Sequence, residues 1–376
     1  MGAGFSADDR LRVTYRLLCV EGETPRDKAE DIAYEQTVEL PPSCVGEAIT
    51  EAVVGRIESV EPGPARSWTA VISYSPEWIG DDAAQLANVM FGNISLKQGI
   101  VITDVEWPTT LLERFGGPAH GVRGLRKMAG VEPERPLLCA ALKPVGLSAE
   151  ELAELCYRFA DGGIDLIKDD HGLTDQPSAP FDERVRRCRE AVAKANDSTG
   201  GNTLYFPNVT GPASRLMDRV ETARGAGCRG VLVSPLLAGL DSLQRLARED
   251  DLAVLAHPAL SGAFFGASHG ILPEILLGDL FRILGADGVI YPNVGGRFPF
   301  DDRICRAIND RLRRDLGKIL PAFPVPGGGI DVKIVPHWIA QYGADTMLLI
   351  GGSLYGQDDL TSATRRLVDQ IKLATS

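Results

Sequence analysis

The sequence lacks three features that would indicate a membrane, secreted or nucleic-acid-binding protein. No uninterrupted run of about 18 apolar residues occurs, so no transmembrane helix is expected. Residues 1–12 are polar and charged, so no secretory signal peptide is expected. Basic residues are in deficit: 39 Lys and Arg stand against 51 Asp and Glu, a net charge of −12. Because phosphate contacts need clustered Lys and Arg, nucleic-acid binding is not the expected main task.

Paired cysteines are also missing. Seven cysteines are scattered over 376 residues, and none forms a Cys-x-x-Cys pair. Zinc sites need closely spaced ligands, so we expect reduced thiols in a cytoplasmic protein and no cysteine-based metal centre. The remaining composition is ordinary: 44% hydrophobic and 24% charged residues are typical of a soluble globular protein and exclude a mainly disordered chain.

The first 135 residues mix strand and helix patterns. Strands are predicted at 11–19, 68–74 and 100–107, and helices at 25–35 and 82–91. This mixture predicts a small α+β domain of ferredoxin-like type, with an antiparallel sheet, over residues 1–135. The segment 116–136 is rich in Gly, Arg and Pro and is expected to be a linker.

From residue 136 onward, short apolar runs alternate eight times with longer helical patterns. Strands that are apolar throughout belong to parallel sheets covered by helices. Eight such units predict a (β/α)8 barrel over residues 136–376; a doubly wound sheet is the competing architecture, but near-equal repeats favour closure. The predicted strands are 137–143, 164–170, 204–210, 230–235, 253–258, 288–293, 319–325 and 346–352.

The active site of such a barrel lies at the carboxyl ends of its strands, which makes the polar residues there candidates. In the run 167–171 (IKDDH), alternate side chains share a face, so Lys168 and Asp170 should lie together and Asp169 should point away. A lysine beside a carboxylate can take up carbon dioxide as a carbamate, and the resulting oxygen ligands would suit Mg²⁺. A plain buried salt bridge at the barrel mouth is the alternative interpretation.

Three further strand-end residues are candidates for proton transfer. Lys143 follows a buried strand, where partial desolvation lowers a lysine pKa and allows it to act as a base. A lysine that reaches solvent past the rim is the alternative. His171 and His257 also end strands and titrate near neutral pH, although either could be a structural histidine.

Glycine clusters end the seventh and eighth predicted strands, at 327–329 and 351–352. Glycine lets backbone N–H groups approach a phosphate, and the loops after these two strands are the usual phosphate site of this fold. Ordinary tight turns are the alternative. Because both loops carry the feature, we expect a phosphate site built from Gly327, Gly328, Gly329, Gly351 and Gly352.

Several motifs in register resemble the large subunit of ribulose bisphosphate carboxylase (RuBisCO). The resemblance covers nearly the whole chain and implies that fold for both domains. Its most specific part is GGIDLIKDD at 162–170. The other matching stretches are 91–93 (FGN), 142–147 (LKPVGL), 208–211 (NVTG), 325–330 (VPGGGI) and 350–352 (IGG).

The resemblance implies a role for each matching residue. Lys168 resembles the lysine that carbon dioxide carbamylates and that binds Mg²⁺, and Asp170 resembles a second metal ligand. Lys143 resembles the lysine that moves the substrate proton. Glu35 and Asn93 resemble residues that one subunit of a homodimer contributes to the active site of the other. Asn208 and the glycine loops fall in substrate- and phosphate-binding motifs.

The departures from the family argue against carboxylation. His171 stands where the third metal ligand, a Glu, is expected, so it is either a ligand or a base. Val145 occupies the motif that carries a second catalytic lysine. Pro258 replaces the phosphate-gripping arginine after His257. The mobile loop with its lysine is replaced by 294–298, where Arg297 could substitute only in part.

The chain is therefore identified as a RuBisCO-like protein of the non-carboxylating type. We expect Mg²⁺-dependent enolisation of a phosphorylated ketose in the cytoplasm, with 5-methylthioribulose 1-phosphate as the best candidate substrate of an isomerase. One alternative is a transcarboxylase, hydrolase or decarboxylase of a branched 3-oxo acid phosphate, such as 3-oxo-isoapionate 4-phosphate. Another is a barrel that binds a ligand without catalysis.

Overall fold

The computed structural model describes residues 9–249, 251–330 and 332–375. Most of residues 1–12, from which no signal peptide was expected, therefore lies outside the described residues. Contacts divide the chain into two units. The first comprises the residues up to Gly116, Leu260–Leu276 and Leu316–Ile319, and the second comprises Gly117–Ala259, Leu277–Asp315 and the residues from Leu320 on. The sequence predicted a division after residue 135 instead.

The first unit is built on a five-stranded sheet in the order β10-β4-β1-β3-β2. Pairing is antiparallel except between β10 and β4. Alternate side chains of β1 are completely buried, and the side chains between them are partly exposed, as a strand with one covered face requires. The strands are β1 (Leu11–Leu17), β2 (Arg56–Pro62), β3 (Trp68–Tyr74), β4 (Ile100–Glu106) and β10 (Gly270–Ile271).

The longer helices of the first unit begin where the sequence provides caps. The Thr24 side chain accepts the N–H of Asp27 at the start of α1 (Pro25–Glu35), and Asp82 accepts two N–H groups at the start of α3 (Ala83–Phe91). The other helices of this unit are α2 (Glu47–Ala52) and α4 (Thr109–Phe115), with 3-10 turns η1 (Pro42–Cys44), η2 (Pro64–Arg66), η3 (Pro76–Trp78), η4 (Asn93–Leu96) and η5 (Ser261–Phe264).

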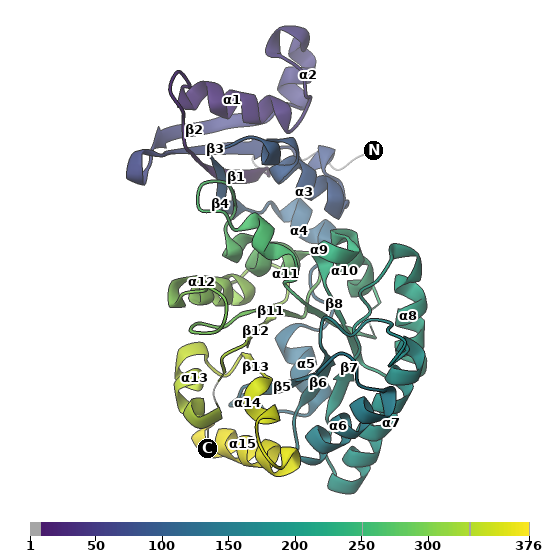
Figure 1. Ribbon diagram of the computed structural model, residues 1–376. Coiled ribbons are helices and arrows are strands. Elements are labelled where there is room, and N and C mark those ends of the chain that lie inside the picture. The colour runs from purple at the N-terminus through teal and green to yellow at the C-terminus, as the bar shows by residue number, and fades with distance from the viewer. Residues whose placement is uncertain (1–8, 250, 331, 376) are drawn as a thin grey trace. The chain divides into compact units, whose positions relative to one another are not determined.

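The second unit is an eight-stranded parallel barrel wrapped by helices (Figure 1). Its strands run in the order β7-β6-β5-β13-β12-β11-β9-β8. A bridge between Asn208 and Leu232, flanked by two backbone hydrogen bonds, joins β7 to β8 and closes the ring. The strands are β5 (Leu137–Leu142), β6 (Leu166–Asp169), β7 (Leu204–Phe206), β8 (Gly230–Val233), β9 (Ala253–Ala256), β11 (Gly288–Pro292), β12 (Phe323–Gly327) and β13 (Met347–Ile350).

Helices follow the barrel strands, and the predicted α+β unit and (β/α)8 barrel are both confirmed. The two helices α6 (Ala149–Asp161) and α7 (Phe181–Thr199) pack against each other. The remaining helices are α5 (Gly121–Ala129), α8 (Ala213–Gly225), α9 (Pro235–Ala238), α10 (Leu240–Ala247), α11 (Phe281–Ile283), α12 (Asp302–Arg313), α13 (Val335–Tyr342), α14 (Gly352–Tyr355) and α15 (Leu360–Thr375), with the π-helix η6 (Glu274–Leu280) and the 3-10 turn η7 (Val332–Ile334).

Two predictions about the connecting segments were wrong. The expected linker at 116–136 contains α5, whose Val122, Leu125 and Met128 join the same buried cluster as inward-facing barrel residues. These apolar positions follow a helical spacing that the surrounding Gly and Arg residues obscure. The seventh barrel strand is Phe323–Gly327 rather than 319–325.

Two buried carboxylates hold the amino-terminal ends of the barrel strands. Asp287, just before β11, accepts the backbone N–H groups of His120, Gly121 and Val254 at 2.7–2.8 Å. Asp165, just before β6, accepts two guanidinium hydrogen bonds from Arg135 at 2.7 and 2.6 Å and the N–H of Leu138. Both carboxylates have fixed partners, so this end of the barrel serves the framework.

Membrane-spanning helices and cysteine pairing can both be checked in the described residues. None of their helices is both long and apolar enough to cross a membrane. The seven cysteines are free thiols, five of them buried.

Candidate active site

Three charged side chains meet at the carboxyl ends of the adjacent strands β5 and β6. Lys143 Nζ lies 3.0 Å from Asp170 Oδ2, and Lys168 Nζ lies 3.4 Å from Asp170 Oδ1. Lys168 is almost fully buried, at 1% side-chain exposure, whereas Lys143 is 41% exposed. The carboxylate therefore lies between one buried lysine and one lysine that can reach a ligand.

Burial and charge shift the pKa values of this cluster. Burial, opposed by the nearby Asp170 carboxylate, lowers the pKa of Lys168. Burial would also raise the pKa of Asp170, but hydrogen bonding to His171 and the charges of Lys168 and Lys143 outweigh it and hold this pKa well below its usual range. Asp170 is therefore ionised over the whole physiological range.

The neighbouring Asp169 points to the opposite side of the strand, as the alternation in 167–171 predicted. Its carboxylate accepts hydrogen bonds from Arg184 Nε at 3.1 Å, from the Tyr205 hydroxyl at 2.8 Å and from the Asn208 N–H at 3.0 Å. Asp169 and Arg184 are both fully buried. This interaction anchors the end of β6, so that Lys168 and Asp170 face the mouth of the barrel.

The two predicted histidines stack on each other beside the cluster. The rings of His171 and His257 are nearly parallel, with centroids 4.3 Å apart, and His171 Nδ1 lies 3.6 Å from Asp170 Oδ1. His257 Nδ1 accepts the N–H of Ala259 at 3.1 Å, so the neutral ring carries its proton on Nε2. Burial, together with the nearby Lys168 and His171, lowers the pKa of His257, which keeps it neutral.

Asn208 lies next to the cluster but uses its side chain for the framework. Its amide donates to the backbone carbonyls of His171 and Leu173 at 3.0 and 2.9 Å, and its Oδ1 accepts the N–H of Thr210. The residue is completely buried. In this arrangement, Asn208 fixes the loop that carries His171, and its side-chain groups are occupied by these three partners.

The predicted glycine loops follow β12 and β13 and lie together. The Ser353 hydroxyl, next to Gly352, donates to the Ile330 carbonyl at 3.1 Å and so joins the two loops. Gly328 and Gly329 have φ values of 80° and 82°, which other residues rarely adopt. The N–H groups of Gly328, Gly329 and Gly352 donate to no acceptor in the described part of the chain, so they are free to bind an anion.

The loop after β11 meets the glycine loop after β12. A Cβ atom on Gly329 would lie 2.9 Å from the Gly296 Cα, so the two loops touch through backbone. Arg297 in this loop is exposed, and its guanidinium lies 6.0 Å from the centre of the Phe298 ring. Arg297 therefore lies in the loop that touches the glycine loop after β12, and no contact joins it to the Lys143–Asp170 cluster among the described residues.

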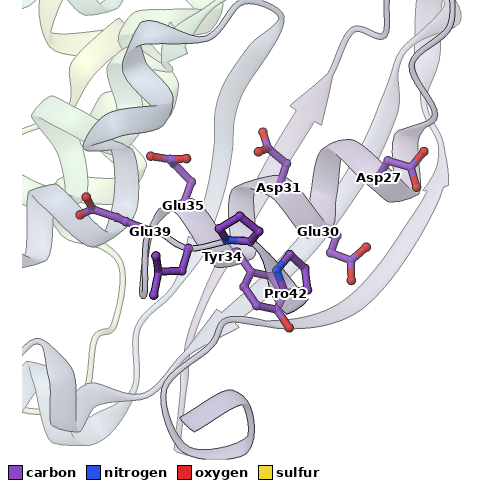
Figure 2. Close-up of a pocket in the computed structure, with 9 residues that line it drawn as sticks. Asp27, Glu30, Asp31, Tyr34, Glu35, Glu39 and Pro42 are labelled. Atoms are coloured by element: carbon purple, nitrogen blue, oxygen red, sulfur yellow. The ribbon is translucent and has the colours of Figure 1, made fainter. Parts of the chain in front are cut away.

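Glu35 and Asn93 lie together in the first unit. Asn93 Nδ2 donates to Glu35 Oε1 at 3.1 Å, and Lys97 Nζ lies 3.3 Å from Glu35 Oε2 and 2.6 Å from Asp31. Glu35 also lines a pocket of about 390 Å³ along α1, where Figure 2 shows it on the same side of the helix as Asp31. Five of the nine lining residues are acidic: Asp27, Glu30, Asp31, Glu35 and Glu39.

Comparison with known proteins decides the family. A model of the ribulose bisphosphate carboxylase large chain, catalytic domain, matches residues 121–367. The chain belongs to the RuBisCO large-chain family. A 5-methylthioribulose-1-phosphate isomerase of Rhodospirillum rubrum is 40% identical over 371 residues, with 98% of each chain covered. A 2,3-diketo-5-methylthiopentyl-1-phosphate enolase of Bacillus licheniformis is 34% identical, covering 92% of this chain and 87% of the relative.

The fold agrees with this assignment. A solved RuBisCO-like protein from Rhodopseudomonas palustris superimposes with a TM-score of 0.88 at 36% identity, covering 97% of this chain and 98% of that one. The resemblance to RuBisCO-like proteins that the motifs predicted is thus confirmed over both units.

The RuBisCO family implies a magnesium ion held with a lysine carbamate, and the residues here fit that ion in one form only. In the unmodified chain, no group of three His, Cys, Asp or Glu side chains among the described residues could hold a metal. The convergence of Lys168 and His171 on Asp170 Oδ1, at 3.4 and 3.6 Å, provides three ligands only if Lys168 becomes an anionic carbamate.

Sequence reasoning missed one residue of this RuBisCO-like site. The Tyr355 hydroxyl, on α14, accepts the backbone N–H of Lys143 at 3.0 Å and donates to the Ala141 carbonyl at 3.0 Å. Tyr355 lies in no recognisable motif. Its position three residues after Gly352 was the available signal.

Proposed function

We propose that this RuBisCO-like protein is an isomerase of 5-methylthioribulose 1-phosphate that works by enolisation and does not fix carbon dioxide. The observation that carries the proposal is the half-exposed Lys143 side chain, whose Nζ lies 3.0 Å from Asp170, in a barrel whose glycine loops have N–H groups that donate to no acceptor among the described residues. The relative that carries this isomerase name covers 98% of the chain. This supports the substrate class.

Lys143 is the residue proposed to move the proton. Enolisation removes a proton from the carbon next to a ketone, and isomerisation returns a proton to the other carbon. The buried Lys168 cannot reach a substrate carbon, whereas the side chain of Lys143 is 41% exposed. Asp170 Oδ2, 3.0 Å away, holds Lys143 Nζ at one position. As the neutral amine, Lys143 would take the proton from one carbon, and the ammonium so formed would return it to the other carbon. The Nε2–H of His257 is available as a hydrogen-bond donor to a substrate oxygen.

Lys168 as its carbamate, Asp170 and His171 would hold Mg²⁺. When bound, the ion supplies positive charge that stabilises the negative charge developing on the substrate oxygens. The burial of Lys168 supports this role, because the lowered pKa favours the neutral amine that reacts with carbon dioxide.

The glycine loops are proposed to bind the single phosphate. Backbone N–H groups of Gly328, Gly329 and Gly352 lack acceptors within the described ranges, and added Cβ atoms at Gly328 and Gly352 would meet open space. Such a site requires no basic surface, which agrees with a chain of net charge −12.

The loop after β11 argues against carboxylation. Carboxylation needs a cationic side chain to steady the added carboxylate, yet no lysine occurs between Lys194 and Lys318. Arg297 is exposed and lies over Phe298. The enediolate that forms is therefore expected to be protonated again rather than carboxylated.

Hydrogen exchange with solvent tests the function. In D₂O with Mg²⁺ and bicarbonate, 5-methylthioribulose 1-phosphate should exchange a C–H proton and isomerise, as followed by NMR. Lys143→Ala should abolish both processes, whereas Lys318→Ala, at an 84% exposed lysine, should retain them. Absence of exchange in the wild-type protein would refute the proposal. Release of a two-carbon acid from a branched 3-oxo acid phosphate would favour cleavage instead.

We further propose that the protein is a homodimer in which Glu35 and Asn93 of one copy complete the site of the other. The 83% exposed Leu96, next to the Asn93–Glu35 hydrogen bond, and the 51% exposed Leu40, beside the acidic pocket, support an interface there. Inactive Lys143→Ala and Asn93→Ala variants, unfolded and refolded together, should regain about a quarter of wild-type activity, because one site in each hybrid is intact. No recovery, with dimers present, would refute a shared site.

A further inference from the structure

The Tyr355 hydroxyl connects two parts of the proposed site that lie on different strands. The ladder between β5 and β13 ends at the pair Ala140 and Ile350. Beyond that pair, the phenol oxygen accepts the Lys143 N–H and donates to the Ala141 carbonyl, each at 3.0 Å. A side chain from α14 thus takes over where the strand pairing stops.

The backbone of Tyr355 is tied in turn to the glycine loop. The Gly351 carbonyl accepts the N–H groups of Leu354 and Tyr355 at 3.0 and 3.3 Å, so the phenol and the proposed phosphate loop belong to one turn of chain. The Tyr355 ring also packs edge-on against the buried Phe159 ring, with centroids 5.6 Å apart. These contacts fix the ring on both sides.

Lys143 needs such an anchor. Its side chain is half-exposed, and Asp170 is the partner that holds its tip, so the position of Lys143 Nζ depends on where its backbone is fixed. A long side chain that transfers a proton loses much of its catalytic efficiency when the backbone atom that carries it shifts by about 1 Å. Burial raises the pKa of the Tyr355 phenol, so the hydroxyl remains protonated and able to donate to Ala141.

We propose that Tyr355 is a positioning residue that sets the distance between Lys143 and the phosphate loop, so that a phosphate bound at Gly351 and Gly352 presents its neighbouring carbons to the Lys143 amine. This inference rests on the proposed roles of Lys143 and of the glycine loops. It assigns Tyr355 no contact with substrate.

The test uses Tyr355→Phe, which keeps the ring against Phe159 and removes only the hydroxyl. In the deuterium-exchange assay, kcat should fall about tenfold while KM changes less than about twofold, since binding groups are untouched. The matched control is Tyr291→Phe, which removes a buried hydroxyl that bonds to Asn309 in the same unit. Tyr291→Phe should leave kcat unchanged, although it should lower the melting temperature by about as much as Tyr355→Phe does.

A second measurement does not depend on the substrate. Pyridoxal 5′-phosphate forms an imine with a lysine near a phosphate site, and borohydride reduction fixes it for peptide mass spectrometry. Wild-type Lys143 should be labelled at least about tenfold faster by pyridoxal 5′-phosphate than by pyridoxal, with the exposed Lys372 as reference. Tyr355→Phe should remove most of this preference while binding of inorganic phosphate stays within about twofold.

The two measurements separate the possible failures. If the wild type does not exchange or isomerise the substrate, the proposed function is wrong, and the labelling comparison still decides the role of Tyr355. An unchanged Lys143 preference in Tyr355→Phe, or no phosphate preference in the wild type, would overturn the positioning role. An equal loss of kcat in Tyr355→Phe and Tyr291→Phe would also overturn it.

Discussion

The two ends of the barrel use the same residue types for opposite purposes. At the amino-terminal end, Asp165 and Asp287 are buried and have several fixed hydrogen-bond donors. At the carboxyl end, Asp170 lies between two lysines, one of which is 41% exposed, and nearby glycine N–H groups have no acceptor within the described ranges. Polar groups whose hydrogen bonds are all made within the protein stabilise the fold, whereas polar groups with hydrogen-bonding capacity left over remain available to a ligand.

The largest expected effect is at the open end. Lys168→Met removes a buried ammonium and the proposed carbamate, so isomerase activity should fall by at least about a thousandfold. Stability should stay the same or rise by about 1 kcal/mol, because methionine fills the site without burying a charge and Asp170 keeps Lys143 as partner. Exchange kinetics and urea denaturation measure the two quantities. Activity above about 1% of wild type would contradict the role of Lys168.

The reverse pattern is expected at the closed end. Asp287→Asn places an amide N–H against one of the three backbone donors that the carboxylate accepts, and this should cost about 2–4 kcal/mol of unfolding free energy. The kcat of the folded variant should be close to that of the wild type. Asp218→Asn, at a 75% exposed carboxylate, should change stability by less than about 0.5 kcal/mol. Equal effects of the two substitutions would remove the contrast between the ends.

A pair of glycines sharpens the comparison further. Gly328 and Gly200 have similar φ values, 80° and 69°, and an added Cβ meets open space at both. Gly328→Ala and Gly200→Ala should therefore each lower the free energy of unfolding by about 1 kcal/mol, because alanine strains the backbone at these φ values. Only Gly328→Ala should also weaken the binding of inorganic phosphate, by about tenfold in a calorimetric titration. Equal phosphate affinity in the two variants would show that the loop after β12 is a turn without a binding role.

The effect expected to be smallest at neutral pH concerns the buried thiols of the framework, because it develops only above about pH 9. Burial raises the pKa of Cys139 to about 12, so above pH 9 this thiol stays protonated in the folded chain and ionises in the unfolded one. The folded state then binds more protons, and stability should fall as the pH rises from about 9 toward 12, by at most about 1.4 kcal/mol per pH unit. Cys139→Ala should flatten this slope in urea denaturation, whereas Cys44→Ala, at an exposed position, should not.

The sequence was most informative where a local pattern determines structure directly. Helix α1 and strand β3 have the predicted bounds. The apolar residues of α1 recur at helical spacing, and β3 is a short apolar run, so each segment determines its own conformation. The alternation in 167–171 correctly separated Asp169 from Asp170, because successive side chains of a strand face opposite sides.

Features that depend on distant contacts could not be predicted in this way. Strand β2 is polar and largely exposed, so no apolar run indicated it, and its pairing with β3 is what defines it. The side chain of Asn208 looked available for a ligand, yet the carbonyls of His171 and Leu173 occupy it. The contact between Tyr355 and Lys143 joins residues 212 positions apart, which no local pattern could indicate.

Helix α5 determines where the chain can be cut. Residues 117–135 lie before the first barrel strand, yet Val122, Leu125 and Met128 form part of the barrel's own buried cluster. An expression fragment that began at residue 136 would expose these contacts to water and is expected to aggregate. Truncations and domain exchanges with other members of the family should therefore keep Gly117 and everything up to Pro136 together with the barrel.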